Sequence, residues 1–209
     1  MIEHAFEMAG VAVFAISGAL AAGRKSLDLL GVVVLAVVTS VGGGTLRDLL
    51  LDRHPIFWIS EPEWLLVIAA AALLTVPFVR KRRPSYRLLE LADALGLALF
   101  SVNGARIAEQ AGLSPVIVVL MGTMTGVAGG AVRDVLTAEI PLVLRPGTLY
   151  ATAAIAGIAL YLAVEALGAP PVLAGGLGMC TVAAIRLASI FWNLRLPVFS
   201  LPDAEETGP

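Results

Sequence analysis

The sequence predicts an all-α integral membrane protein of seven transmembrane helices, built as two inverted three-helix repeats plus a seventh helix. Three observations predict this fold class. The chain is 58% hydrophobic and only 14% charged, whereas a soluble domain carries roughly 25% charged residues. Long uncharged segments recur along the chain, and two stretches of it share one pattern in a single register.

Six segments lack charged residues over nearly the length of about 17 to 25 residues that a spanning helix needs. They are residues 8–23, 29–46, 64–79, 110–132, 146–164 and 166–185. A seventh segment, residues 88–111, is more polar, because it contains Glu90, Asp93, Asn103, Arg106 and Glu109. Its apolar run at residues 95–100 is typical of a helix. We therefore expect this segment to form a central helix that does not face lipid.

The distribution of basic residues predicts the orientation, because these residues gather on the cytoplasmic side of a membrane protein. With seven spans, the other side carries only Arg53 and Arg106. The basic side carries Arg24, Lys25, Arg80, Lys81, Arg82, Arg83, Arg87, Arg145 and Arg195. We expect a multi-pass protein of the cell (inner) membrane with its N-terminus outside and its C-terminus in the cytoplasm.

The internal repeat has an offset of 86 residues, the separation of Arg47 from Arg133. The same offset relates Glu7 to Asp93, Gly10 to Gly96, Phe14 to Phe100 and Ser17 to Asn103. Each repeat contains three spans, an odd number, so the second copy enters the membrane in the opposite sense. The prediction is one membrane domain, residues 1–209, with repeats at 1–86 and 87–171, a seventh helix at 172–193 and an acidic tail at 203–209. In such folds the solute path lies at the repeat interface.

Glycines form the first half of the duplicated motif. They are Gly42, Gly43 and Gly44 in the second span, and Gly129 and Gly130 in the fifth. Glycine has a low helix propensity, about 1 kcal/mol below alanine, and leaves backbone carbonyls open to a cavity. We expect both helices to kink there. The alternative is close helix packing, since Gly122, Gly126 and Gly130 form a small-residue ridge,.

An Arg-Asp pair follows the glycines in each copy, Arg47 with Asp48 and Arg133 with Asp134. Ionisable residues within spans usually face the bundle interior or water. Counted at about 1.5 Å per residue, the pairs lie near the membrane boundaries, where snorkelling to the headgroups is the alternative. Neighbouring helical side chains point about 100° apart, so the two members of a pair cannot both snorkel to the headgroups by the same route.

A second group of candidates lies on the first and fourth spans. Helical spacing places Glu7, Phe14 and Ser17 on one face of the first, and Asp93, Phe100 and Asn103 repeat that face in the fourth,. Ordinary core packing is the simpler interpretation of the two phenylalanines. For Asp93 a buried ion pair with a motif arginine and a role in a solute path remain open. Arg186 in the seventh span either pairs with an acid or contacts an anionic lipid.

Several function classes are disfavoured by the composition. No nucleophile–base pair or metal-ligand spacing occurs, so the sequence does not indicate an enzyme, a cofactor or a metal site. The single cysteine, Cys180, lies within a predicted span and excludes an intramolecular disulfide framework,. The net charge of −2 argues against a nucleic-acid partner. Whatever the protein does is therefore expected to take place within the bilayer.

The chain resembles the prokaryotic trimeric intracellular cation channels, through its seven spans, its inverted three-helix repeats and both glycine-rich Arg-Asp motifs at 42–48 and 129–134. The resemblance implies a homotrimer with one pore in each protomer, lined by the second and fifth helices together with the first and fourth. It also implies permeation of monovalent cations, potassium or sodium, with potassium favoured. The second motif has Ala128 in place of the first glycine, so the fifth helix is expected to bend less.

Two functions therefore compete. In a cation channel, carbonyls at the glycines and the carboxylates of Asp48 and Asp134 would replace ion hydration, while Arg47 and Arg133 restrain these acids or act as a gate. Ser17, Asp93 and Asn103 would line the same path. The second function is a secondary carrier of a small solute such as glycine, which an inverted repeat fits equally well. The gating stimulus and the binding of a particular membrane lipid remain open.

Overall fold

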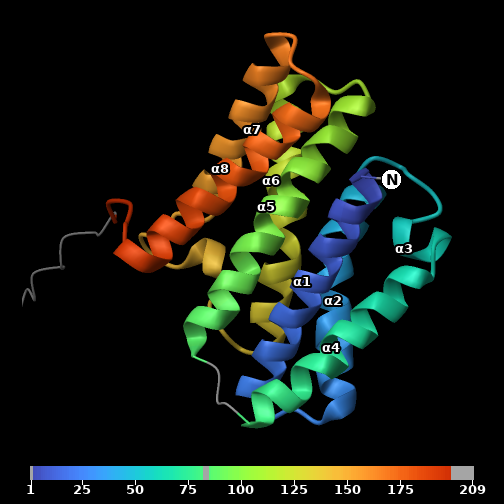
Figure 1. The fold of residues 1–209 in the computed structure, drawn as a ribbon, viewed down its shortest axis with the longest axis vertical. Coiled ribbons are helices and arrows are strands. Elements are labelled where there is room, and N and C mark those ends of the chain that lie inside the picture. Colours follow the sequence, from blue (N-terminus) through green and yellow to red (C-terminus); the bar gives the residue numbers. More distant parts are fainter. Residues whose placement is uncertain (1, 82–84, 199–209) are drawn as a thin grey trace, which may run out of the picture.

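The computed structural model describes residues 2–81 and 85–198, with side chains from residue 7 onward, and the predicted acidic tail lies outside these residues. The described chain is helical apart from its loops, one 3₁₀ turn and an isolated β-bridge between Thr148 and Arg195. Figure 1 shows the arrangement. The elements are α1 (Ile2–Arg24), α2 (Leu29–Leu50), α3 (Phe57–Ser60), α4 (Glu63–Lys81), α5 (Tyr86–Gln110), α6 (Pro115–Leu136), η1 (Leu142–Leu144), α7 (Ala151–Ala166) and α8 (Pro171–Trp192).

Six of the described helices are long and apolar enough to cross a membrane, namely α1, α2, α4, α5, α6 and α8. The protein is therefore an all-α, multi-pass membrane protein, as predicted. The remaining apolar helix, α7, has only 16 residues, and seven spans remain a prediction. It begins later than predicted because Gly147, at φ 77°, turns the chain before it. The last helix, α8, begins at Pro171, after Gly168, at φ 85°, ends the preceding helix.

Successive long helices run in alternating directions, so their loops gather at two ends (Figure 1). We call the end where α1, α4, α6 and α8 finish the basic end, because most of the described basic residues lie there. Two contacts join its loops directly. Lys25 Nζ lies 2.7 Å from Glu139 Oε1, and the Arg24 guanidinium lies 4.9 Å from the centre of the Tyr86 ring. The loops after α1 and α6 and the start of α5 are therefore held together.

The fourth long helix, α5, occupies the centre of the bundle, as its polar sequence predicts. It packs against α1, α6, α7 and α8 and is the most buried of the six candidate spans. Lipid tails are as apolar as leucine, so close packing and hydrogen bonds hold such helices together more than the hydrophobic effect does. The small residues Ala94, Ala98 and Ala105, all fully or almost fully buried, allow that close packing and place the polar groups of α5 between its neighbours.

Candidate functional site

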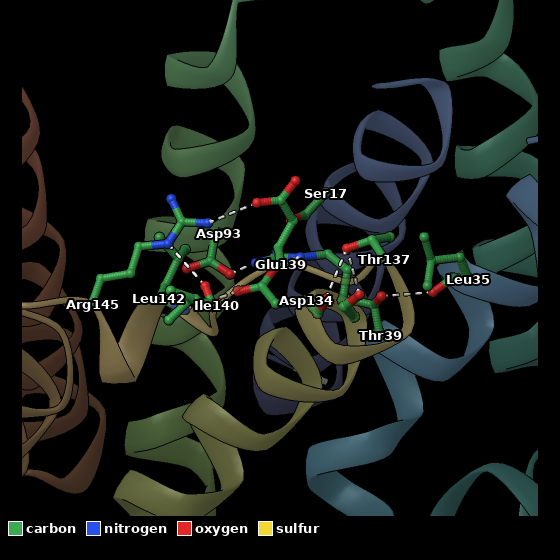
Figure 2. A network of polar contacts seen from close by, with 11 residues as sticks. Ser17, Leu35, Thr39, Asp93, Asp134, Thr137, Glu139, Ile140, Leu142 and Arg145 are labelled. Carbon is green, nitrogen blue, oxygen red and sulfur yellow. Dashed lines mark hydrogen bonds and ion pairs between the residues drawn. The ribbon is translucent and has the colours of Figure 1, made fainter. Parts of the chain in front are cut away.

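The second copy of the motif lies near the basic end of α6 and joins polar groups from three helices. Arg133 is completely buried, and its Nε donates to Asp134 Oδ1 at 2.8 Å. Its Nη1 donates to Asp93 Oδ1 at 2.8 Å and also to Ser17 Oγ. Figure 2 shows Ser17, Asp93 and Asp134 close together in this network. Because Ser17 belongs to α1 and Asp93 to α5, one guanidinium connects both predicted repeats.

The charges of this Arg133 cluster explain why it is stable in an apolar interior. Burying an unpaired ion costs several kcal/mol, and the cost is offset only when its hydrogen-bonding groups are satisfied. Here one guanidinium meets two carboxylates and a hydroxyl, and Asp93 Oδ2 is the carboxylate oxygen that is buried without a hydrogen-bond partner among the described residues. Asp134 Oδ2 also accepts the backbone N–H of Leu142 at 2.9 Å, which anchors η1 to α6. With both carboxylates ionised, the cluster has one negative charge in excess.

The first copy of the motif, near the opposite end of α2, has the same local geometry but different neighbours. Arg47 Nε donates to Asp48 Oδ1 at 2.9 Å, and Asp48 Oδ2 accepts the N–H of Phe57, the first residue of α3, at 3.0 Å. The Arg47 guanidinium lies 5.8 Å from the centre of the Phe57 ring. The counterparts of the serine and aspartate in the other cluster bond to each other, since Asn103 Nδ2 donates to Glu7 Oε1 at 2.8 Å.

The burial of the motif side chains excludes one alternative from the sequence, namely that they snorkel to the headgroups. Arg47 and Asp48 are 4% and 2% exposed, and Arg133 and Asp134 are 0% and 4% exposed. Side chains that snorkelled to the headgroups would be accessible at the protein surface. All four instead lie inside the protomer. The pairs themselves are far apart along the fold, because one ends α2 at the opposite end and the other ends α6 at the basic end.

An aromatic pair lies between the two polar groups. Phe14 of α1 and Phe100 of α5 stack with their ring centres 5.1 Å apart and their planes 12° from parallel. Each ring occupies space left by a glycine of the other repeat. A methyl group added at Gly10 would lie 3.1 Å from the Phe100 ring, and one added at Gly96 would overlap the Phe14 ring. The packing interpretation of the phenylalanines is therefore confirmed, and their packing is reciprocal.

The motif glycines mark a tight crossing of α2 and α6. A methyl group at Gly43 would overlap the carbonyl oxygen of Thr125, and one at Gly129 would overlap the carbonyl oxygen of Thr39. The 86-residue offset relates these two contacts, because it pairs Gly43 with Gly129 and Thr39 with Thr125. At Gly42 the nearest atom would be the Gly129 Cα at 3.6 Å, an ordinary contact. Both helices are continuous through the glycines, so close packing is their observed role and the kinks remain a prediction.

The small-residue ridge of α6 faces the protomer interior. A methyl group at Gly122 would lie 2.6 Å from the carbonyl oxygen of Ser101, and one at Gly126 would lie 2.9 Å from the Ser101 Cβ. At Gly130 the nearest atom would be Asp93 Oδ1 at 2.8 Å. The ridge therefore packs on α5, and it carries no support for an interface between subunits.

The Arg133 cluster approaches the surface through a cavity of about 20 Å³ at the basic end, whose lining includes Asp134 and Glu139 together with the basic residues Arg24, Lys25 and Arg145. Glu139 is at the edge of this cavity and is exposed. A hydrogen bond from Lys25, together with the lysine's charge, lowers the pKa of the Glu139 carboxyl below its usual value. Arg145 Nη2 lies 3.8 Å from the same carboxylate, and Figure 2 shows Glu139 and Arg145 beside the cluster.

The structure thus brings four sequence-predicted residues, Ser17, Asp93, Arg133 and Asp134, into one cluster, while Asn103 joins Glu7 elsewhere. The ion-pair interpretation of Asp93 is confirmed. The roles of the paired threonines were missed, although Thr39 and Thr125 are also 86 residues apart and the repeat offset could have found them. No pattern indicated that backbone N–H groups would bond to the motif aspartates. Within the described residues, no group of three or more His, Cys, Asp or Glu side chains could hold a metal ion.

Comparison with known proteins gives the family. A family model described as "Glycine transporter" matches residues 4–80 and again residues 90–166. The second match begins 86 residues after the first, in the register of the internal repeat. The two matches together cover more than half of the chain.

Relatives match along almost the whole chain. The UPF0126 inner membrane protein YadS of Escherichia coli K12 is 45% identical over 205 residues, covering 97% of this chain and 99% of its own. A UPF0126 membrane protein of Vibrio cholerae is 43% identical over 199 residues, covering 95% of this chain and 83% of its own.

Solved structures agree with this assignment. The TRIC trimeric intracellular cation channel orthologue from Rhodobacter sphaeroides is 42% identical, with a TM-score of 0.88 over 92% of this chain and 99% of that chain. A second TRIC cation channel is 33% identical, with a TM-score of 0.86 over 98% of this chain and 100% of that chain. The chain therefore belongs to the membrane-protein family that includes the prokaryotic trimeric intracellular cation channels.

Proposed function

We propose that the protein is a monovalent cation channel that prefers potassium, with one pore in each protomer of a homotrimer in the cell (inner) membrane. The Arg133 cluster carries this proposal. Charged groups from both repeats meet there in a completely buried position, and ionisable groups inside a membrane usually mark an ion or substrate path. The similar solved structures, a trimeric intracellular cation channel orthologue and a second TRIC cation channel, support the same function and assembly.

The proposed path follows the interface of α1 and α5, with α2 and α6 beside it. From the opposite end an ion would pass the Glu7 and Asn103 side chains, which are hydrogen-bonded to each other. It would next meet the stacked pair of Phe14 and Phe100, an apolar constriction. Beyond that pair lies the Arg133 cluster, followed by the small cavity at the basic end. Apolar constrictions and rings of charge are both recurring gate elements in channels.

Charge favours cations at two groups along this path, although the cavity at its basic end also has Arg24, Lys25 and Arg145 in its lining. The Arg133 cluster has two carboxylates for one guanidinium, and the groups near the opposite end, Arg47, Asp48 and Glu7, have the same ratio. An excess negative charge in a low-dielectric path raises the local concentration of cations. Carboxylate and hydroxyl oxygens then stand in for lost water. The preference for potassium over sodium rests on the family resemblance.

Arg133 is the proposed gate. Its Nη1 occupies the position between Ser17 Oγ and Asp93 Oδ1 that a permeating cation would use. In this arrangement the basic-end half of the path is closed. Opening requires the guanidinium to leave Ser17 and Asp93 while keeping its bonds to Asp134, its neighbour on α6. The two arrangements would be the closed and open states.

A secondary carrier of glycine is the second candidate, favoured by the description of the matching family model. A zwitterion could pair its ammonium group with Asp93 and its carboxylate with Arg133. Inverted repeats are common among carriers, and their sites lie at the repeat interface near the membrane midplane. Fold likeness does not separate a carrier from a channel.

Planar bilayers containing the purified protein test the two candidates directly. Under a KCl gradient, a channel gives unitary current steps that reverse near the potassium equilibrium potential. Proteoliposomes loaded for radiolabelled glycine uptake provide the second measurement. Glycine accumulation coupled to an ion gradient, without current steps, would overturn the channel in favour of the carrier.

Assembly and orientation have separate tests. Cross-linking of the protein in lipid is expected to end at a trimer, and a monomer at every lipid ratio would contradict the homotrimer. A cytoplasmic reporter fused after Pro209 is expected to be active. A periplasmic reporter active at that position would overturn the predicted orientation, in which the basic end faces the cytoplasm.

A further inference from the structure

Two acidic side chains, Glu109 of α5 and Glu165 of α7, lie at the end of the bundle opposite the basic end. Tyr161 of α7 is 1% exposed, and its hydroxyl donates to Glu109 Oε2. Glu165, one helical turn further along α7, lies within hydrogen-bonding reach of both the Glu109 carboxyl group and the Tyr161 hydroxyl. We call these three residues the carboxyl clasp, because they join the ends of α5 and α7.

The repeat offset shows that the carboxyl clasp is confined to the second repeat. Counting back 86 residues from Glu109 and Glu165 gives Gly23 and Val79. A methyl group added at Gly23 would lie 2.6 Å from Val79 Cγ1, so these two positions of the first repeat face each other directly, across α1 and α4. An apolar contact in the first repeat is therefore replaced by two carboxyl groups in the second.

The hydrogen bonds of the carboxyl clasp are incomplete when both glutamates are ionised. Ionised carboxylates only accept hydrogen bonds, so two of them cannot bond to each other. Tyr161 has a single O–H group and donates it to Glu109. Glu165 Oε2 is buried without a hydrogen-bond partner among the described residues. A proton on either carboxyl group supplies the missing donor and allows the two groups to bond to each other.

The charges around the carboxyl clasp also balance only with one proton. Arg106, one turn before Glu109 on α5, attracts the Glu109 carboxylate. With Arg106 charged, a clasp that holds one proton is neutral, whereas two ionised carboxylates leave one negative charge in a half-buried position. Taking an uncompensated charge out of water is costly. The charge count therefore agrees with the hydrogen bonds.

The neighbouring helices direct their own ionisable side chains elsewhere. Glu7 of α1 accepts from Asn103, Arg186 of α8 donates to the carbonyl oxygen of Leu149, and Cys180 of α8 is exposed. The other ionisable side chains described on α1 and α6 lie toward the basic end, and they are Arg24, Arg133 and Asp134. The protonation of the clasp is therefore governed by its own groups and Arg106.

We propose that the carboxyl clasp is a pH-sensitive contact between α5 and α7, closed by a single proton that Glu109 and Glu165 share. When this proton leaves, two like charges stand in contact, and their repulsion weakens the packing of the end of α7 on α5. The predicted orientation places this end outside, so the clasp responds to the external pH. Proton binding is measurable without any current, so the proposal does not depend on the proposed ion path.

The first test detects the protonated carboxyl group by infrared difference spectroscopy of the purified, full-length protein between pH 7 and higher pH. The wild type should show the carbonyl absorption of a protonated carboxyl group at pH 7, and this absorption should disappear as the pH rises. Glu165→Gln and Glu109→Gln should each lose it. Glu63→Gln is the matched control, because Glu63 is exposed at the same end, at the start of α4, and it should keep the absorption.

The second test measures the unfolding temperature from pH 5 to pH 9. Because the folded pair keeps a proton that the unfolded chain has already released, stability falls as the pH rises. This contribution is complete below the ordinary glutamate pKa of 4.5 and is lost as the shared proton leaves the folded pair. Glutamine at position 165 donates to Glu109 at every pH. The wild type and Glu63→Gln should therefore lose about 2–4 °C more than Glu165→Gln across this range.

Both measurements can overturn the proposal. It is wrong if the wild-type absorption at pH 7 is unchanged in both glutamine variants of the clasp. It is also wrong if the unfolding temperatures of the wild type and Glu165→Gln have the same pH profile, because a proton held only by the folded state must change that profile. Glu109→Gln gives the same comparison from the other helix if Glu165→Gln does not fold.

Discussion

The two copies of the Arg-Asp motif are locally alike and globally different. In both, the arginine Nε bonds to the next residue's carboxylate, and that carboxylate also holds the start of a short helix. Arg133 additionally reaches Ser17 and Asp93 on two other helices. Among the described residues, the hydrogen-bond and ion-pair partner of Arg47 is Asp48, and its guanidinium lies near the Phe57 ring. The same motif therefore links three long helices at one end of the bundle and only α2 with the short helix α3 at the other.

Side-chain length explains this difference. Ser17 and Asp93 have short side chains, and Arg133 Nη1 donates to both of them across the interface of α1 and α5. Their counterparts Asn103 and Glu7 are each longer and bond directly to each other at 2.8 Å. A duplicated motif can thus diverge through the residues around it while remaining unchanged itself. In a channel, such divergence would place the moving gate in one half of the path.

Removal of each arginine should show the largest contrast. Arg133→Ala leaves two buried carboxylates without their cation, a loss of about 3–5 kcal/mol in stability for breaking a buried pair. Arg47→Ala leaves one carboxylate that still accepts the Phe57 N–H, so its loss should be clearly smaller. Thermal unfolding in detergent measures both. If Arg133 is also the gate, the surviving folded fraction of Arg133→Ala should pass more cation current per protein. Equal losses in the two variants would remove the contrast between the clusters.

Substitutions at the glycine crossing of α2 and α6 should lower stability to a similar extent in the two repeats, unlike substitutions of the two arginines. Gly43→Ala and Gly129→Ala each place a methyl group on a backbone carbonyl of the other helix, and overpacking costs typically about 1–3 kcal/mol. The two variants should lose similar stability. Gly42→Ala is the matched control, since its methyl group would have an ordinary 3.6 Å contact. A destabilised Gly42→Ala with a stable Gly43→Ala would contradict the observed crossing.

The motif aspartates should affect conduction similarly from the two ends. Asp134→Asn or Asp48→Asn removes one unit of charge beside the proposed path, worth about 1 kcal/mol at ~4 Å in water. Cation conductance in bilayers should then fall about fivefold. Asp52→Asn, at an exposed carboxylate beyond the end of α2, should leave the conductance unchanged. Stable trimers of both variants with wild-type conductance and ion preference would show that the motif has a packing role only.

The smallest expected effect concerns the ion pair of Lys25 and Glu139, which has no counterpart at the opposite end because Arg53 stands at the position equivalent to Glu139. The pKa of Glu139 is lowered in the folded protein. Its stabilising contribution is therefore complete above the ordinary glutamate pKa of 4.5 and is lost as the pH falls through the lowered value. Exposed ion pairs contribute little. Unfolding temperatures measured from pH 7 to pH 3 should drop slightly less in Glu139→Gln than in the wild type, and an identical profile would contradict this contribution.

Much of the fold was predictable because a membrane imposes simple rules. Uncharged segments of sufficient length predicted the spanning helices, and the polar residues of 88–111 correctly predicted a central helix. A helix end was less predictable where a glycine turn interrupts apolar sequence, as at Gly147. Periodicity cannot detect such turns, because glycine counts as apolar.

The sequence predicted which residues form the site, but it predicted the contacts between them only in part. The repeat offset identified both Arg-Asp pairs, and the pairing of Asp93 with a motif arginine was one of two stated alternatives. The sequence could not show that Arg133 bridges three helices while Arg47 does not. That difference depends on whether side chains from α1 and α5 reach each other, which is a three-dimensional property. Likewise, Gly122 and Gly126 form the pattern of a helix-packing ridge, but the pattern does not say which helix they pack against.

The reciprocal packing of phenylalanine on glycine has a consequence for the history of the chain. Phe14 fills the space at Gly96, and Phe100 fills the space at Gly10. Two copies of one three-helix ancestor, inserted in opposite senses, would make this contact twice from a single Phe and a single Gly. Fusion into one gene preserves the contact but lets the copies mutate separately. Each aromatic residue then constrains a glycine in the other half, so the two halves must evolve together, and a half exchanged between relatives keeps its fit only when the matching glycine comes with it.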